Sequence, residues 1–194
     1  MIDGDLRVAA VGVLDLCRSH GLKVATAESC TGGLVAAALT EIAGSSDVVD
    51  CGFVTYSDEA KQTMLGVPAA TLARHGAVSR ETAIAMAKGA LAHSRADIAV
   101  SITGIAGPGG GSQAKPVGLV HFAAAARRGR TIHRSKRYGD IGRRRVRAQS
   151  VLEALAMLVV LAKERGATPS RKPDRRGART RRRSGGTQRR TWRP

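Results

Sequence analysis

The sequence predicts an α/β fold, built as a single three-layer α/β/α sandwich with a mixed sheet. Short apolar segments rich in β-branched residues alternate with longer segments of helical periodicity, as expected for strands covered by helices. Residues 117–126 and 131–138 alternate around an Arg-Gly-Arg turn and indicate an antiparallel hairpin. A chain of 194 residues accommodates one such domain and is too short for two of ordinary size.

Local sequence features define the expected elements in order along the chain. Glycines mark several helix ends, while Ser57 and Ser79, each with an acidic residue in the following turn, mark helix starts. The expected helices cover residues 5–20, 34–43, 57–66, 69–75, 79–94 and 143–165. The expected strands cover residues 22–27, 48–56, 97–102, 117–126 and 131–138.

A change in composition divides the chain into a domain over residues 1–165 and a basic tail over 166–194. The tail has Trp192 as its only large apolar residue and is expected to be disordered. Residues 163–194 hold 13 of the 32 Lys and Arg residues and two of the 15 acidic residues, which places +11 of the net charge of +17 there. Non-specific contact with a polyanion is therefore expected only through the tail.

Cysteine and histidine usage bounds the chemistry. The three cysteines form no CxxC pair, and the five histidines show no HxH or HExxH spacing, so we expect no disulfide framework, no metal and no cofactor. The sequence shows no charged-then-apolar leader and no apolar run near the roughly 20 residues of a membrane helix. These features predict a cytoplasmic protein without membrane contact.

Three polar or glycine-rich loops each follow an apolar strand, over residues 28–33, 56–61 and 103–111. The crevice at the carboxyl ends of parallel strands is the usual ligand site of an α/β sheet. If these strands are parallel, the three loops meet in one place. The sequence therefore predicts a single site built from all three loops.

The loop 28–33 offers a hydroxyl and backbone N–H groups at a helix start. Ser29 is the candidate nucleophile, and the amides around Thr31, Gly32 and Gly33 could hold a phosphate or an oxyanion. The alternative is an ordinary serine N-cap. Cys30 is interpreted as a packing residue, because no histidine is recognisably placed to activate it.

Lys61 is the candidate base. A lysine one turn into a helix is usually solvated, but a lysine beside a serine hydroxyl in a partly desolvated cleft can lose its proton and act as a base. Ser–Lys pairs are a known solution for acyl transfer, and the sequence lacks a clear Ser-His-Asp alternative. Tyr56 could donate a hydrogen bond or stack on a ring, or could be a plain strand residue.

The loop 103–111 and the start of the last helix supply the remaining candidates. Five glycines in nine residues, Gly104 and Gly107 among them, favour close backbone approach to a ligand over a merely flexible loop. Arginines crowd the start of the last helix, and one or two of them, Arg143 or Arg147, could clamp a phosphate.

The same segments closely resemble the CinA C-terminal domain family, in order over roughly residues 5–162. The motifs that carry the resemblance are Ala27–Gly33, Gly44–Ser46, Gly52–Lys61, His75–Ser79, Ser101–Pro108 and Lys115–Gly118. One departure is the Gly139-Asp140-Ile141-Gly142 run before Arg143, where the family usually has Gly-Asp-Arg. Because of this insertion, Arg143 and Arg147 both remain candidates for the family's arginine. The basic tail is not part of the family pattern. The N-terminal domain of longer CinA proteins has no counterpart in this sequence.

The resemblance implies a stand-alone nicotinamide-nucleotide amidase. Such an enzyme converts nicotinamide mononucleotide to nicotinate mononucleotide and ammonia in pyridine-nucleotide recycling, without a metal. The family pattern places the nucleophile at Ser29 and its base at Lys61, with Tyr56 and Thr103 lining the site and one arginine binding substrate. A homodimer is also implied by the family.

Two other hypotheses stay open at this point. One is a catalytically silent, competence- or damage-related binding protein with nucleic-acid affinity through the tail. Against it, the predicted body shows no aromatic-lined basic face and no known nucleic-acid module. The other is an enzyme of another type that uses residues 28–33 only to hold an anion.

Overall fold

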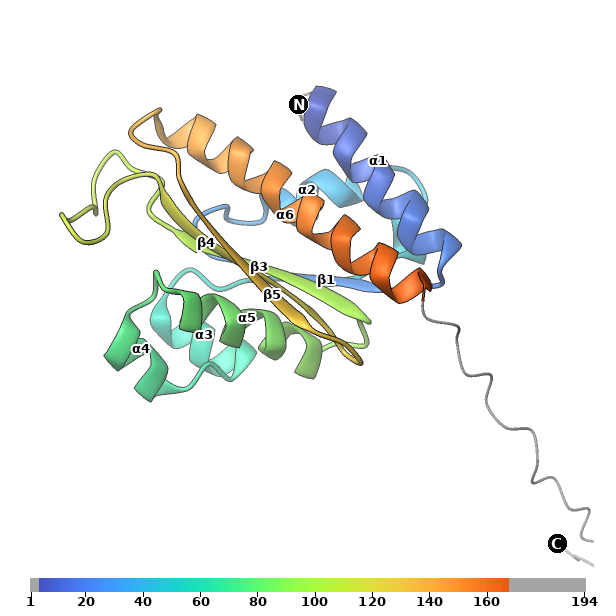
Figure 1. Ribbon diagram of the computed structural model, residues 1–194, viewed down its shortest axis with the longest axis horizontal. Coiled ribbons are helices and arrows are strands. Elements are labelled where there is room, and N and C mark those ends of the chain that lie inside the picture. Colours follow the sequence, from blue (N-terminus) through green and yellow to red (C-terminus); the bar gives the residue numbers. More distant parts are fainter. Residues whose placement is uncertain (1–3, 168–194) are drawn as a thin grey trace, which may run out of the picture.

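A five-stranded mixed sheet lies between two layers of helices in the computed structural model, which describes residues 4–167 (Figure 1). The strand order is β2-β1-β3-β4-β5, in which β2, β1 and β3 run parallel and β4 and β5 continue antiparallel. This arrangement confirms the predicted mixed sheet and the hairpin. The strands are β1 (Val24–Glu28), β2 (Val49–Val54), β3 (Ile98–Gly104), β4 (Leu119–Ala126) and β5 (Thr131–Arg137).

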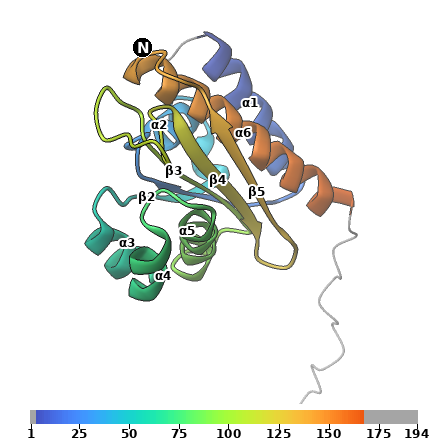
Figure 2. The same cartoon turned by 60° about the vertical axis from the view of Figure 1, so that its left-hand side comes forward.

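The helices divide between the two faces of the sheet, as the two views in Figures 1 and 2 show. One face carries α1 (Gly4–Ser19), α2 (Leu34–Thr40) and α6 (Arg143–Ala167). The other carries α3 (Asp58–Leu65), α4 (Ala69–His75) and α5 (Arg80–Ala92). A short 3-10 helix, η1 (Ser45–Asp47), precedes β2. The predicted three layers are thus confirmed.

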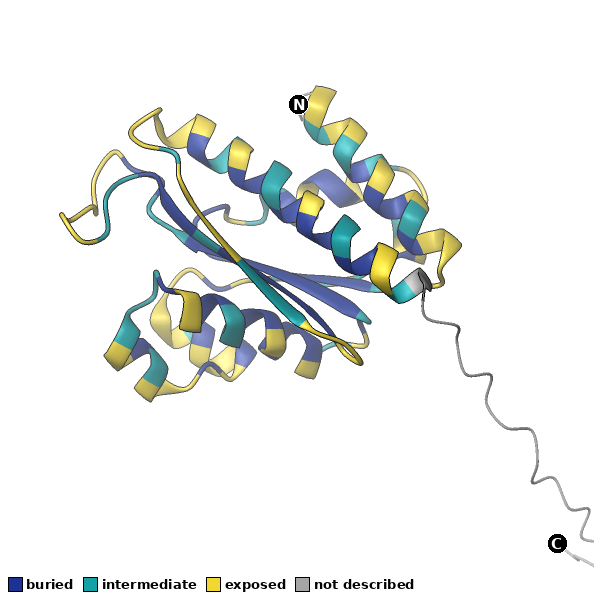
Figure 3. Cartoon of the chain, in the orientation of Figure 1, coloured by how far each residue is buried: buried dark blue, intermediate teal, exposed yellow. Residues whose placement is uncertain are grey.

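The two faces of the sheet are packed by side chains of different size. Alternate residues of β3 show this: Val100 and Ile102 pack under α1 and α6, whereas Ala99 joins the core under α5. Alanines dominate the α5 face of the sheet, at Ala25, Ala27, Ala99, Ala123 and Ala125. Small residues let α5 approach the sheet closely, which suits a chain with only 3% aromatic residues. Figure 3 shows the buried residues gathered along the sheet and on the helix faces turned towards it.

Most predicted boundaries hold because the local capping chemistry is correct. The Ser57 hydroxyl accepts from the amide of Ala60 at 3.0 Å and the Ser79 hydroxyl from the amide of Thr82 at 3.1 Å. Gly66 closes α3 in the left-handed conformation, with φ 64°.

Several predicted boundaries differ from the structure, among them the following three. The predicted strand 48–56 stops at Val54, because Thr55 and Tyr56 leave the sheet to enter the turn before α3. The predicted helix 34–43 ends at Thr40. The predicted strand 97–102 continues to Gly104, because both added residues pair with β4.

The last helix continues to Ala167, two residues past the predicted domain boundary. The predicted disordered tail lies, from residue 168 on, outside the described residues. Within residues 4–167, no helix is long and apolar enough to cross a membrane.

Candidate active site

A pocket of about 270 Å³ opens at the carboxyl ends of β1, β2 and β3. The chain leaves β1 towards β2, at one edge of the sheet, and leaves β3 towards β4, in the direction of the other edge. The pocket therefore lies where the connections diverge. All three predicted loops contribute to it. Its lining residues are Ser29, Cys30, Tyr56, Lys61, Ala77, Val78, Thr103, Gly104, Ile105, Ala106, Gly107, Gly109, Gly110 and Arg143.

The turn after β1 presents Ser29 to this pocket. Ser29 extends the pairing of β1 with β3 by one residue, because its amide donates to the carbonyl of Ile102 at 2.9 Å. The chain then reverses through Gly32 and Gly33, which have φ of 60° and 94°. These left-handed values favour glycine at both positions.

The two glycine amides of this turn are used inside the protein. The amide of Gly32 donates to the carbonyl of Ser29 at 3.0 Å, and that of Gly33 donates to the Glu28 carboxylate at 3.0 Å. Thr31, Gly32 and Gly33, all predicted to bind substrate, do not line the pocket. The amide of Cys30, by contrast, donates to no other described residue and contacts only its own thiol, and Cys30 lines the pocket.

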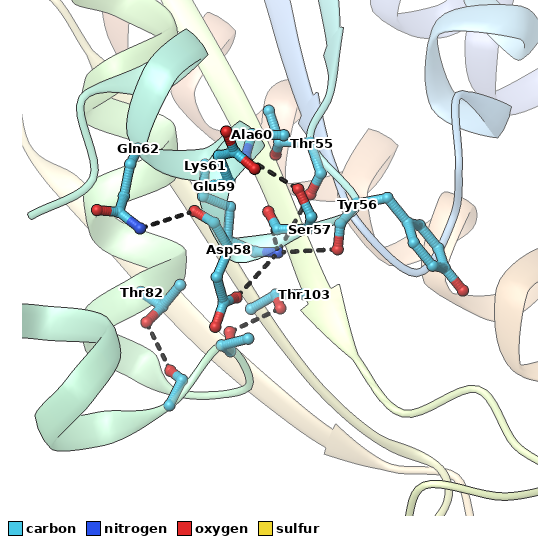
Figure 4. Close-up of polar contacts among 12 residues, drawn as sticks. Thr55, Tyr56, Ser57, Asp58, Glu59, Ala60, Lys61, Gln62, Thr82 and Thr103 are labelled. Atoms are coloured by element: carbon cyan, nitrogen blue, oxygen red, sulfur yellow. Dashed lines mark hydrogen bonds and ion pairs between the residues drawn. The ribbon is translucent and has the colours of Figure 1, made fainter. Parts of the chain in front are cut away.

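Lys61 is the most deeply buried charged group at the pocket, with 1% of its surface exposed. Its Nζ donates to the carbonyls of Thr55, Tyr56 and Ser57 at 3.1, 3.3 and 3.3 Å (Figure 4). The carboxylate of Asp58 lies 3.7 Å from the same nitrogen. Burial lowers the pKa of the Lys61 ammonium below its usual range, and the Asp58 carboxylate opposes that shift.

The hydroxyl of Ser29 and the ammonium of Lys61 line one pocket, without a hydrogen bond between them. A protonated lysine has three N–H donors and no acceptor site, and here three carbonyls face those donors. A neutral amine keeps two N–H groups and gains a lone pair. Loss of a proton would therefore free one position on Nζ for a hydroxyl donor.

Tyr56 and Arg143 meet at the rim of the pocket. The Tyr56 side chain is 64% exposed, and its ring points away from the Lys61 ammonium (Figure 4). Nη2 of Arg143 lies 3.4 Å from the Tyr56 hydroxyl, and Nη1 donates to the carbonyl of Gly107 at 3.1 Å. Arg143 thus links the tyrosine to the glycine-rich loop and leaves its guanidinium exposed beside the opening.

Thr103 lines the opposite wall. Its buried hydroxyl donates to the carbonyl of Ala77 at 2.8 Å (Figure 4), which leaves only the acceptor side of that oxygen for a ligand. Lys115, which follows the glycine-rich loop in the sequence, joins that part of the chain to the segment before Ala77. Its Nζ donates to the carbonyl of His75 at 2.6 Å. Ala77 and Val78 lie within the quoted His75–Ser79 motif, yet sequence reasoning gave them no role.

The two arginines that the sequence left as alternatives occupy different places. Arg143 lines the pocket, whereas Arg147, one helical turn later, points to the turn behind Ser29 and donates from Nη2 to the carbonyl of Thr31 at 2.7 Å. Sequence reasoning also missed Glu28, which is fully buried under the start of α2. The available clue was an acidic residue at the end of an otherwise apolar strand.

Cys30 lines the pocket beside Ser29 but is held as a neutral thiol. Burial raises the pKa of the Cys30 thiol to about 12, and the Glu28 carboxylate adds to that shift. The backbone amide of Cys30 itself, Arg147 and Arg143 oppose it. The thiolate, which is the nucleophilic form of cysteine, is therefore scarce near neutral pH. Elsewhere in residues 4–167, no three side chains of His, Cys, Asp or Glu gather closely enough to hold a metal ion.

A mixed sheet with helices on both faces and a pocket at the carboxyl ends of its parallel strands is the architecture of many α/β enzymes. Comparison with known proteins narrows the class. The model of the CinA C-terminal domain matches residues 7–161, and the chain belongs to that family.

Curated relatives match the chain over different lengths. The chain is 52% identical over 159 residues to the nicotinamide-nucleotide amidohydrolase PncC of Escherichia coli. The aligned segment covers 81% of this chain and 95% of that protein. It is 60% identical over 111 residues to a CinA-like protein of Chloroherpeton thalassium, covering 57% of this chain and 26% of that protein. The match along most of the length of an amidohydrolase identifies the chain as an amidohydrolase.

Solved structures agree with this family assignment. The competence/damage inducible protein CihA from Agrobacterium tumefaciens superposes with a TM-score of 0.82 at 58% identity, covering 83% of this chain and 98% of that chain. A CinA superfamily protein from Klebsiella pneumoniae gives 0.77 at 40% identity, covering 82% of this chain and 98% of that chain.

Proposed function

We propose that the protein hydrolyses the carboxamide of nicotinamide mononucleotide, giving nicotinate mononucleotide and ammonia, as part of pyridine-nucleotide recycling. The observation that carries the proposal is the presence of the Ser29 hydroxyl and the buried Lys61 ammonium in one pocket. The 52% identity to a nicotinamide-nucleotide amidohydrolase supports the substrate.

The proposed reaction proceeds through an acyl-enzyme. Neutral Lys61 takes the proton of Ser29 as the serine oxygen bonds to the carboxamide carbon. The C–N bond then breaks, and the proton passes from Lys61 to the departing ammonia. Water attacks the ester, leaves its hydroxyl on the nicotinate carbonyl and returns a proton through Lys61 to Ser29. Each step uses only groups of the chain, substrate and water.

The surrounding residues take supporting roles in this proposal. The amide of Cys30, which donates to no other described residue, stabilises the oxyanion that develops beside Ser29. Thr103, whose proton is committed to Ala77, accepts a hydrogen bond from the carboxamide NH₂. Tyr56 and Arg143 at the rim contact the ring and the phosphate, respectively, because a guanidinium suits a phosphate.

Ammonia release from nicotinamide mononucleotide, measured with a chelator present, tests the proposal. We expect the full chain to be active and Ser29→Ala and Lys61→Met each to lower kcat by about 10²-fold or more with the fold intact. Lys61→Met keeps most of the length of the buried side chain and removes its base. A folded parent protein that releases no ammonia but binds nucleic acid would instead favour the catalytically silent alternative.

A further inference from the structure

The turn that carries Ser29 is held from two sides by charged groups outside the pocket. Glu28 lies beneath it, at the end of β1, and Arg147 reaches it from α6. Neither side chain lines the pocket. Their contacts therefore concern the shape of the turn rather than direct contact with a ligand.

The Glu28 carboxylate gathers the first backbone amides of α2. It accepts from the amides of Gly33, Val35 and Ala36 at 3.0, 3.1 and 2.9 Å. The side chain is 0% exposed, and a fourth donor, the Thr26 hydroxyl, lies at 3.3 Å. Charge-assisted bonds to three amides fix where the chain re-enters the helix after Ser29.

Arg147 holds the same turn from α6. Its Nη2 donates to the carbonyl of Thr31 at 2.7 Å, while its Nε is buried without an acceptor among the described residues. The guanidinium therefore binds the turn through Nη2 while its Nε–H forms no hydrogen bond with a described residue. Its contact orients the peptide that follows Thr31.

Together these contacts decide which amides of the turn remain available. The amides of Gly32 and Gly33 are occupied by Ser29 and Glu28, respectively. Within the described part of the chain, the amides of Cys30 and Thr31 have no backbone acceptor, and that of Cys30 contacts only its own thiol. Cys30, whose amide is bound by no other residue, follows Ser29 directly and lines the same pocket.

We propose that Glu28 and Arg147 are positioning residues, a two-sided clamp that holds Ser29 and the Cys30 amide in their reactive arrangement. The inference rests on the proposed function, in which Ser29 is the nucleophile. It separates Arg147 from Arg143: the first sets the geometry of the turn, and the second contacts the substrate.

The two roles predict opposite kinetic signatures. Loss of the clamp misplaces the nucleophile and the oxyanion donor, so Glu28→Gln and Arg147→Met should each lower kcat at least about tenfold and leave KM within about twofold of the parent. The carboxamide introduced by Glu28→Gln has a single acceptor oxygen and cannot serve all three backbone donors at once. Arg143→Met should instead raise KM.

Matched variants separate positioning from general destabilisation. Thr26→Val removes only the hydroxyl donor to Glu28, and Arg144→Met removes an exposed arginine of the same helix. Both should keep the parent kcat even where the Tm falls. A second readout is the rate at which a simple alkyl fluorophosphonate labels Ser29, because labelling needs the hydroxyl and the oxyanion donor but not the nucleotide.

Each outcome decides the matter. Parent-like kcat and labelling in folded Glu28→Gln or Arg147→Met, or a raised KM alone in Arg147→Met, overturns the clamp. Should Glu28→Gln not fold, Arg147→Met on α6 decides alone. A parent that labels at Ser29 but releases no ammonia refutes the proposed substrate, while slower labelling in the two variants still supports the clamp. A parent that does neither refutes both proposals.

Discussion

At the residue scale, the pocket places a buried ammonium beside a hydroxyl and a neutral thiol. The low exposure of Lys61 and its lowered pKa make it suited to lose a proton, which an exposed lysine would not do near neutral pH. The raised pKa of Cys30 has the opposite consequence, since its thiol stays protonated. Burial in one pocket therefore favours the neutral form of both side chains, the amine of Lys61 and the thiol of Cys30.

The pH profile of kcat/KM should report on Lys61. In the proposed mechanism the neutral amine is active, so activity is present above the Lys61 pKa and is lost as pH falls through it. The Asp58 carboxylate raises that pKa, so Asp58→Asn should lower it further and move the rise of kcat/KM to lower pH. Glu59→Gln removes an acid from the same helical turn without a recorded contact to Lys61, and its profile should match the parent. A shift of the Asp58→Asn profile to higher pH would contradict the assignment of Lys61 as base.

Cys30→Ala should keep most of the activity. The thiol is protonated near neutral pH, and the backbone amide that we assign to the oxyanion survives the substitution. We expect kcat within about threefold of the parent and a modest fall in Tm from the lost buried sulfur. Complete loss of ammonia release by a folded Cys30→Ala protein would transfer the nucleophile from Ser29 to Cys30.

At the scale of elements, the site depends on how closely the helices approach the sheet and one another. α5 crosses the end of α3 at Gly89, where a Cβ would collide with the carbonyl oxygen of Leu65. α3 carries Lys61, so this crossing helps to fix the helix on which the lysine lies. Alanines on the facing strands allow the same close approach from the other side of α5.

Two glycine substitutions should therefore have opposite effects on stability. Gly89→Ala has no room for its methyl group and should lower the free energy of unfolding by about 1–3 kcal/mol. Gly12→Ala, in α1 with nothing within 4 Å of the new Cβ, should raise it by about 0.5–1 kcal/mol through helix propensity. Chemical denaturation of both variants tests the pair. Equal effects would show that helix propensity, and not the α3–α5 crossing, governs position 89.

At the scale of the whole molecule, the candidate site lies within the described domain. Every residue that lines the pocket lies between Ser29 and Arg143, at one edge of the sheet. Much of the positive charge lies after residue 163 instead. Catalysis and contact with polyanions are therefore expected to separate along the chain.

A chain that ends at Ala167 should keep the kcat/KM of the full chain within about twofold. The truncation leaves α6 and the whole pocket in place. Binding of duplex DNA at low salt should fall sharply, because most of the excess Lys and Arg is removed. An inactive but folded truncated protein would show that the segment after Ala167 takes part in catalysis.

The sequence by itself determined the order of the elements, the sandwich architecture and the candidate pair Ser29 and Lys61. Hydrophobic periodicity, glycine stops and serine caps are local properties, so they can be seen without coordinates. The resemblance to the CinA C-terminal domain then supplied the expected chemistry, and the family comparison confirmed that membership.

Only the tertiary structure decided which of those residues meet. Arg143 and Arg147 are one turn apart on one helix and look equivalent in the sequence, yet one lines the pocket and the other binds the turn behind it. The same holds for Glu28, whose partners lie on the following helix, and for the glycine amides, which Ser29 and Glu28 occupy. The direction of a side chain and the satisfaction of a backbone amide depend on neighbours brought together by folding, so local patterns do not contain them.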